Sequence, residues 1–104
     1  MATPTTALEH PEAGAIELID VLSALSDPSR LAIVRQLADG SGEGMACQAV
    51  GGDLAKSTRS HHLKTLREAG LTRTRPSGTT RYVSLRRADL DERFPGLLDA
   101  VLSS

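Results

Sequence analysis

The sequence predicts one mainly α-helical domain with a small β-hairpin, and three observations carry this prediction. Apolar residues recur at helical spacing in several segments: 12–25, 28–39, 56–69 and a broken terminal stretch over 88–93 and 95–102. Two β-like runs, 71–75 and 80–85, flank the turn-forming tetrapeptide 76–79. The chain has 104 residues, which is enough for one modest hydrophobic core. We therefore expect a folded domain over 12–104, preceded by a flexible polar tail over 1–11.

The first predicted helix has a wide apolar face. On a helical wheel its large apolar side chains cover roughly 200°, against the ~100° stripe that is usual for a surface helix. These side chains are Ile16, Leu18, Ile19, Val21, Leu22 and Leu25. One domain core can cover only about half of this arc. The remainder predicts a partner helix, most economically from a second copy of the chain.

The second predicted helix begins at a strong local signal. Asp27 can accept hydrogen bonds from the free backbone N–H groups of the first turn, and Pro28 fits the first helical position. The glycine-rich segment 39–44 ends this helix. The apolar segment 45–50 is predicted to be a short helix, and Gly70 is predicted to end the following, third helix.

Positive charge is concentrated in one third of the chain. Nine of the twelve lysines and arginines lie between Lys56 and Arg87, where Glu68 is the single acid. The rest of the chain carries twelve acids against three arginines. A cationic block of this kind can bind a phosphate backbone, while the acidic surroundings limit non-specific association. The charge alone is explained equally simply by a solvated charged surface. The arrangement of these residues along the predicted helix and hairpin decides between the two interpretations.

One face of the third predicted helix is polar and basic. It carries Ser57, Ser60, His61, Lys64 and Glu68. Leu63, Leu66, Ala69 and Gly70 lie on the opposite, core-facing side. Hydroxyl, imidazole and ammonium groups suit the base edges and phosphates of a DNA major groove, which is about 12 Å wide and admits one helix. The free N–H groups at the start of the helix also attract phosphate.

The predicted hairpin adds three arginines, which can bind phosphates with two hydrogen bonds each. Two helices joined by a tight turn and followed by a basic hairpin form a winged helix-turn-helix. The sequence therefore predicts a protein that binds double-stranded DNA. The candidate DNA-binding residues are Lys56, Ser57, Thr58, Arg59, Ser60, His61, Lys64, Arg73, Arg75 and Arg81. Tyr82, within the hairpin, is expected to pack the hairpin onto the helices.

The segment 57–71, STRSHHLKTLREAGL, resembles the recognition helix of the ArsR/SmtB family of bacterial repressors. The segment 24–34, ALSDPSRLAIV, resembles the start of that family's second helix, and the similarity runs from about 17 to 85. The resemblance implies a homodimeric transcriptional repressor that binds a palindromic operator and pairs through its first and last helices, which agrees with the wide apolar arc. Two positions depart from the family pattern. Ala55 stands where a capping Ser or Thr is usual, so that Asp53 is the alternative cap, and Arg59 stands on the usually apolar side.

A metal sensor is not indicated by the sequence. Cys47 is the only cysteine, whereas a thiolate metal site needs two or more that are closely spaced. His61 and His62 are adjacent and point about 100° apart on a helix, so they cannot chelate one ion. We interpret His61 as a DNA-facing donor and His62 as a packing residue. His10 lies in the predicted tail, and residues 88–104 contain no histidine. No metal or other cofactor is therefore expected. The effector stays open between an organic molecule, a redox signal, a partner protein and none. Cys47 is interpreted as a small buried side chain, with a redox sensor or a metal ligand as the alternatives.

Other functions are less compatible with the sequence. The chain shows no paired acid and base, no glycine-rich phosphate loop and no activated nucleophile, so it is not expected to be an enzyme. It has no apolar run of the ~20 residues that cross a membrane and no signal peptide, which predicts a soluble, cytoplasmic protein. Two alternatives remain: a winged helix that binds another protein, and a redox- or metal-responsive switch that uses Cys47. A protein-binding module would favour an apolar or acidic outer face, whereas this face is basic.

Overall fold

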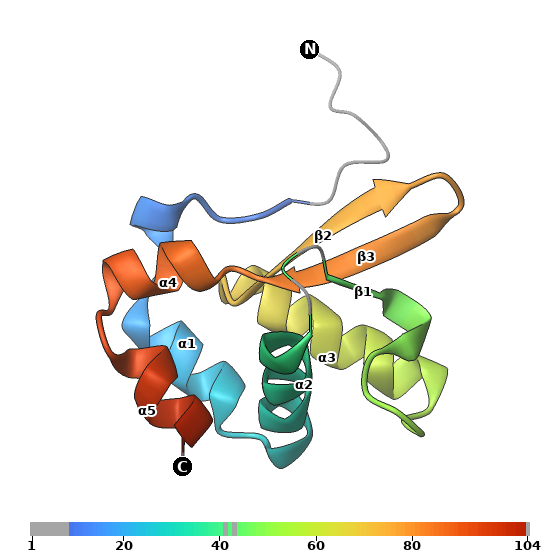
Figure 1. Cartoon of the computed structure of the whole chain (residues 1–104), viewed down its shortest axis with the longest axis horizontal. Helices are drawn as coiled ribbons and strands as arrows, with labels where there is room; N and C mark the ends of the chain where they lie inside the picture. The colour runs from blue at the N-terminus through green and yellow to red at the C-terminus, as the bar shows by residue number, and fades with distance from the viewer. Residues whose placement is uncertain (1–8, 41, 43, 104) are drawn as a thin grey trace.

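The computed structural model describes residues 9–40, 42 and 44–103, and it shows helices that lie below and beside a small sheet (Figure 1). The helices are α1 (Leu18–Leu25), α2 (Pro28–Asp39), α3 (Lys56–Glu68), α4 (Arg87–Arg93) and α5 (Leu97–Ser103), with 3-10 turns η1 (Ala13–Ala15) and η2 (Cys47–Ala49). The strands are β1 (Met45–Ala46), β2 (Thr72–Ser77) and β3 (Thr80–Leu85). The mainly helical prediction is confirmed, and the predicted hairpin is part of a three-stranded antiparallel sheet in the order β1-β3-β2. No helix among the described residues is long and apolar enough to cross a membrane.

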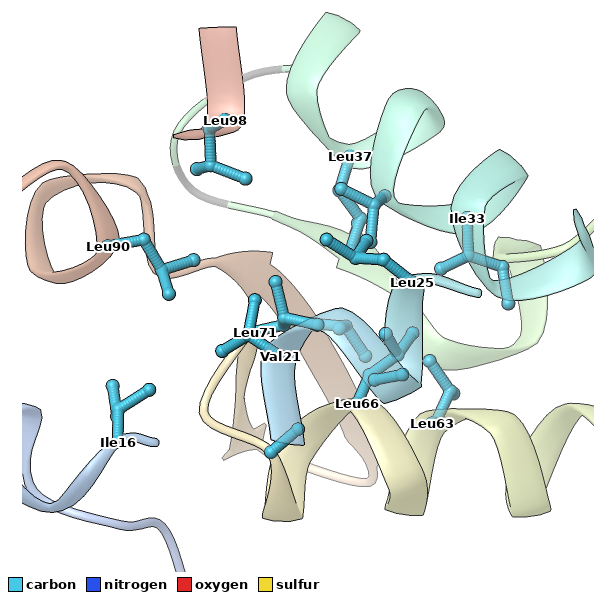
Figure 2. Close-up of a cluster of buried hydrophobic side chains, with 14 of the residues drawn as sticks. Ile16, Val21, Leu25, Ile33, Leu37, Leu63, Leu66, Leu71, Leu90 and Leu98 are labelled. Carbon is cyan, nitrogen blue, oxygen red and sulfur yellow. The ribbon is translucent and has the colours of Figure 1, made fainter. Parts of the chain in front are cut away.

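The core is built almost entirely from aliphatic side chains, as the shortage of aromatic residues requires (Figure 2). Side chains from every α-helix and from the β3 strand meet in it. Its fully buried members include Ile16, Val21, Ile33, Val34, Leu66, Leu71, Val83, Leu90 and Leu98. Because α2 and α3 share this core with the sheet, their relative orientation is fixed by packing.

The first helix is shorter than predicted. The 3-10 turn η1 precedes an extended stretch at Ile16 and Glu17, and α1 begins only at Leu18. Ile16 is therefore buried in the core and does not belong to the apolar face of the helix. Three large apolar side chains of α1 remain exposed: Leu18 at 45%, Ile19 at 69% and Leu22 at 43%. The apolar face of the first helix is thus narrower than predicted, but part of it is still not covered by the core.

The predicted start of α2 is confirmed, whereas the predicted short helix over 45–50 is found only at 47–49. The Asp27 carboxylate accepts a hydrogen bond from the backbone N–H of Arg30 at 3.0 Å, and Pro28 is the first helical residue. In the segment 45–50, β1 pairs with β3 and only η2 is helical. A short apolar run fits a strand as well as a helix, and here pairing with the distant β3 strand decides.

The end of α3 directs the chain into the sheet. The N–H of Gly70 donates to the carbonyl of Arg67, and the N–H of Leu71 donates to that of Leu66, both at 3.0 Å. This is the Schellman arrangement, in which the residue after the cap adopts a left-handed conformation. Gly70 has φ of +90°, which confirms its predicted role, and a Cβ atom there would lie 2.6 Å from Cγ1 of Ile16.

The hairpin turn is tighter than predicted. The pairing of Ser77 with Thr80 leaves only Gly78 and Thr79 in the loop, and Gly78 has φ of +64°. Pro76 therefore lies within β2, where it is tolerated because β2 is an edge strand. The broken terminal helix is confirmed as α4 and α5, which are separated by a bend.

His10 and Pro11 of the predicted tail contact the folded domain, while residues 1–8 lie outside the described residues. The backbone N–H of Thr74 donates to Nε2 of His10 at 3.0 Å. The buried guanidinium of Arg86 donates to the carbonyl of Pro11 at 2.7 Å. The chain before η1 is thus attached to β2 and to the residue that follows β3.

Candidate nucleic-acid interface

The outer face of α3 is exposed as the sequence predicts. We call this surface the recognition face; it consists of the exposed residues Lys56, Ser57, Thr58, Ser60, His61 and Lys64. On the opposite side, Leu63 and Leu66 are buried in the core and hold the helix in place. Hydroxyl, imidazole and ammonium groups are thus presented to solvent on a rigidly anchored helix.

The predicted capping of α3 by Asp53 is not found, because no side chain of the described residues caps the helix, whose N-cap position is Ala55. The N–H groups of its first turn therefore lack a side-chain acceptor. Such free N–H groups, together with the positive end of the helix dipole, form a ready site for a phosphate. The unusual Ala55 consequently leaves room for an anion at the start of the recognition face.

Arg59 has a structural role that sequence reasoning missed. Its Nε donates to the carbonyl of Val50 at 2.7 Å, and its Nη2 donates to those of Gly52 and Leu54, each at 3.2 Å. These carbonyls belong to the turn between η2 and α3. The guanidinium of Arg59 lies at the start of the helix, where it is occupied by backbone oxygens. Arg59 thus fixes the turn that positions α3.

The buried side chain of His62 on α3 contacts polar side chains at the start of α2. Nδ1 of His62 lies 3.4 Å from Nη1 of Arg30, and its Nε2 lies 3.9 Å from the Asp27 carboxylate. Arg30 also donates to the carbonyl of Ala24 at 2.7 Å. His62 is 9% exposed, so its predicted packing role is confirmed. The backbone N–H of Arg30 lowers the pKa of Asp27, which therefore stays ionised at neutral pH.

The three hairpin arginines do not share one face of the wing, by which we mean the β2–β3 hairpin. Arg75 pairs with Tyr82, whereas Arg81 pairs with Pro76. Since directly paired residues lie on the same side of a sheet and neighbours alternate, Arg81 lies on the side of the buried Val83, toward the helices. Arg73 and Arg75 lie on the other side. The structure therefore separates a set that the sequence treated as one clamp.

Tyr82 lies on the same side of the wing as Arg75. The guanidinium of Arg75 lies 5.3 Å from the centre of the Tyr82 ring, within the range of a cation–π contact. The expectation that Tyr82 packs the hairpin onto the helices is therefore wrong, because its side of β3 is opposite to that of the buried Val83. Arg73, on the same side, lies 3.6 Å from the Asp89 carboxylate.

A cleft of about 420 Å³ lies between α3 and the wing, and we call it the cationic cleft. Its basic residues are Lys56, Arg59, Lys64, Arg67 and Arg81. Its other walls include Cys47, Leu63 and Thr74. None of the described residues that line it is acidic. The structure thus brings Arg81 together with some of the predicted residues of α3 around one concave surface. These are Lys56, Arg59, Ser60 and Lys64, whereas Ser57, Thr58 and His61 do not line the cleft.

Cys47 is half-buried in this cleft. Burial raises the pKa of its thiol, although Arg81, Arg59 and Arg67 act in the opposite direction. The thiol is therefore protonated at neutral pH, which disfavours the redox-sensor alternative because the thiolate is the reactive form. Among the described residues, no three His, Cys, Asp or Glu side chains are grouped as a metal site would require.

Comparison with known proteins gives consistent results. The family model described as a helix-turn-helix domain matches residues 25–75. An uncharacterized HTH-type transcriptional regulator, YceK, from Bacillus subtilis (strain 168) is 48% identical over 83 residues, which cover 78% of this chain and 82% of that protein.

Solved structures share the fold. An ArsR family transcriptional regulator, RHA00566, matches with a TM-score of 0.64 and 22% identity over 84% of this chain and 97% of its own. Reduced HlyU from Vibrio cholerae N16961 matches with a TM-score of 0.59 and 24% identity, covering 74% of this chain and 87% of its own. An ArsR-like transcriptional regulator from Rhodococcus sp. RHA1 matches with a TM-score of 0.60 and 23% identity, covering 83% of this chain and 86% of its own. The chain therefore belongs to the helix-turn-helix transcriptional regulators, which are not enzymes, and has the winged helix-turn-helix fold of ArsR-type regulators.

Proposed function

We propose that this regulator is a homodimeric repressor that binds a palindromic operator with α3 in the major groove. The observation that carries the proposal is the recognition face, which is exposed, polar and basic on a helix anchored by the core. A major groove admits one helix, and its base edges offer acceptors and donors for such side chains. In Figure 1 the wing projects on the side of the molecule away from α5, where it can reach the flanking DNA backbone.

Different residues have different roles in this proposal. Ser57, Ser60, His61 and Lys64 contact base edges and adjacent phosphates in the groove. Lys56 and Thr58, beside the uncapped start of α3, bind a phosphate together with the free N–H groups. Arg81 contacts the backbone from the cleft side of the wing, and Arg73 and Arg75 from its other side. Arg59 acts indirectly, because its guanidinium is occupied by the turn.

The dimer is proposed to form through α1 and α5. Leu18, Ile19 and Leu22 leave an apolar surface on α1 that the described part of the chain does not cover. The half-buried side chains of α5 include Leu97, Val101 and Leu102. Figure 1 shows α1 and α5 at the end of the molecule opposite to the wing, so pairing there leaves both recognition faces accessible. Two such helices contact half-sites one helical turn of DNA apart, about 34 Å.

The test uses binding of selected duplexes and of unrelated duplexes by the full chain, measured by fluorescence anisotropy over a range of salt. Arg81→Ala should weaken binding evenly across sequences and reduce the salt slope by about one, because it removes one phosphate contact. His61→Ala should instead change the preferred sequence, by about 1–3 kcal/mol for each base contact that it removes. A folded protein that ignores duplex DNA in dilute buffer would refute the proposal. A template transcribed faster with the protein than without it would refute the repressor assignment alone.

A further inference from the structure

The cationic cleft holds more positive charge than its surroundings neutralise. Lys56, Lys64, Arg67 and Arg81 form no ion pair with any described residue, although ion pairs occur elsewhere in the domain. No acid lines the cleft among the described residues. Several like charges along a concave wall create a strong local attraction for anions. The cleft is therefore preorganised for a negatively charged group.

Arg67 is the cleft residue nearest the C-terminal end of α3. Its Nε atom is buried and has no hydrogen-bond partner among the described residues. A buried donor without an acceptor is costly, so an acceptor from outside the chain that the Arg67 side chain turns to meet would be bound favourably. Lys56 and Arg67 are eleven residues apart on α3, which corresponds to about 16 Å along the helix. The cleft is thus longer than a single phosphate contact requires.

The floor of the cleft is apolar rather than ionic. Leu63 contributes a side chain that is only 7% exposed, and Cys47 contributes a thiol between the helix and the sheet. The volume of about 420 Å³ lies within the range of pockets that hold small organic molecules. An apolar floor combined with basic walls matches a molecule that has both an apolar body and an anionic group.

We infer that the cationic cleft binds a small organic anion, such as an aromatic carboxylate, and that this ligand competes directly with DNA. The carboxylate lies between Arg67 and Arg81, and the apolar body covers Leu63 and Cys47. Because Lys56 and Lys64 belong both to the cleft and to the recognition face, a bound anion neutralises the charge that DNA needs. The competition depends on the proposed DNA binding, whereas binding of the anion does not.

The binding test uses naphthalene-2-carboxylate, whose own fluorescence reports association, and the neutral naphthalen-2-ylmethanol at matched ionic strength. The carboxylate should bind the full chain at least tenfold more tightly than the alcohol. Arg67→Gln should weaken carboxylate binding at least fivefold, while Arg35→Gln, which removes one charge outside the cleft, should not. Equal affinity for the two compounds, or equal effects of the two substitutions, would overturn the inference.

A second variant tests the floor without removing a charge. Cys47→Leu places a larger side chain in the cleft and should weaken carboxylate binding at least fivefold, while duplex DNA remains bound. Unchanged carboxylate affinity in this variant would place the ligand elsewhere and contradict the inference.

Competition is measured by titrating a duplex oligonucleotide into protein with and without the carboxylate. At a free carboxylate concentration ten times its own Kd, simple competition raises the apparent Kd for DNA about 11-fold. Simultaneous binding of both ligands, with no change in either affinity, would overturn the competitive part. If the carboxylate binds but no duplex does, the anion site stands and the proposed function fails. If the duplex binds but the carboxylate does not, the proposed function stands and the anion site is refuted.

Discussion

Replacing Arg59 with lysine separates a structural role from a DNA contact at the same position. Lysine keeps the positive charge, but its single nitrogen cannot reproduce a guanidinium that donates to three separate carbonyls. The shortest of these hydrogen bonds reaches Val50 at 2.7 Å; those to Gly52 and Leu54 are longer, at 3.2 Å. The turn before α3 is therefore expected to loosen although the net charge is unchanged.

The size of the effect follows from these three hydrogen bonds. A hydrogen bond from a charged donor contributes about 1.5–3 kcal/mol, and a typical one about 0.5–1.5 kcal/mol. We count the 2.7 Å bond to Val50 as charged and the two 3.2 Å bonds as typical. Because the lysine ammonium can restore part of this hydrogen bonding, the expected loss for Arg59→Lys is about 2–4 kcal/mol. This is a large part of the roughly 5–15 kcal/mol that stabilises a domain.

The assay is urea unfolding followed by far-ultraviolet circular dichroism at one fixed protein concentration, because dimer formation makes stability depend on concentration. The midpoint for Arg59→Lys should fall by roughly 1–2 M. Lys64→Arg, a swap of charged groups on the exposed side of the same helix, should leave the midpoint unchanged. If Arg59→Lys unfolds at the wild-type midpoint but binds duplex DNA less tightly, the guanidinium contacts DNA and the structural argument is wrong.

Three further predictions concern stability and assembly. Gly70→Ala should lower the free energy of unfolding by about 2–4 kcal/mol, since φ is +90° and the new Cβ meets Ile16. Gly78→Ala, with φ of +64° and open space around the new Cβ, should lower it by only about 1–2 kcal/mol. Equal losses of stability in thermal unfolding would contradict this. The pKa of Asp27 is lowered on folding, so its stabilisation is complete above the ordinary carboxyl pKa and is lost as the pH falls through the lower, folded value. Asp27→Asn, which keeps a capping side chain, should remove this contribution to the pH dependence of stability. If the unfolding midpoints of the variant and the wild type fall equally as the pH is lowered, the contribution of Asp27 is refuted. Ile19→Glu, at a side chain that is 69% exposed, should convert a dimer of about 22 kDa into the 11.0 kDa monomer in sedimentation equilibrium, and a dimer that persists would rule out α1 as the interface.

The parts of the fold that could be predicted depend on signals within a few residues of each other. Asp27 with Pro28 determines the start of α2, and Gly70 determines the end of α3, through local backbone chemistry. The recognition face could be identified for the same reason, because helical periodicity is a local property. The strand β1 could not, since Met45 and Ala46 become a strand only by pairing with residues nearly forty positions later.

The functional side chains show the same division. The role of Arg59 depends on the carbonyls of a folded turn, which no pattern of side chains reveals. The separation of Arg81 from Arg73 and Arg75 does have a sequence signal, the length of the hairpin loop. A two-residue loop at Gly78 and Thr79 places odd-numbered residues of β2 on the same side as even-numbered residues of β3. The expected four-residue turn would place Arg75 opposite Thr80 and gives the same alternation, so the separation could already have been worked out from the predicted hairpin.

The contact between His10 and Thr74 also has a consequence for how this protein behaves at high concentration. β2 is an edge strand, and unpaired N–H groups on such a strand can recruit a strand from another molecule. Nε2 of His10 occupies one of these donors, and Pro76 has no N–H to offer at all. Shortened chains that begin at η1 would uncover the Thr74 donor, and they are expected to aggregate through this margin of the sheet more readily than the full chain.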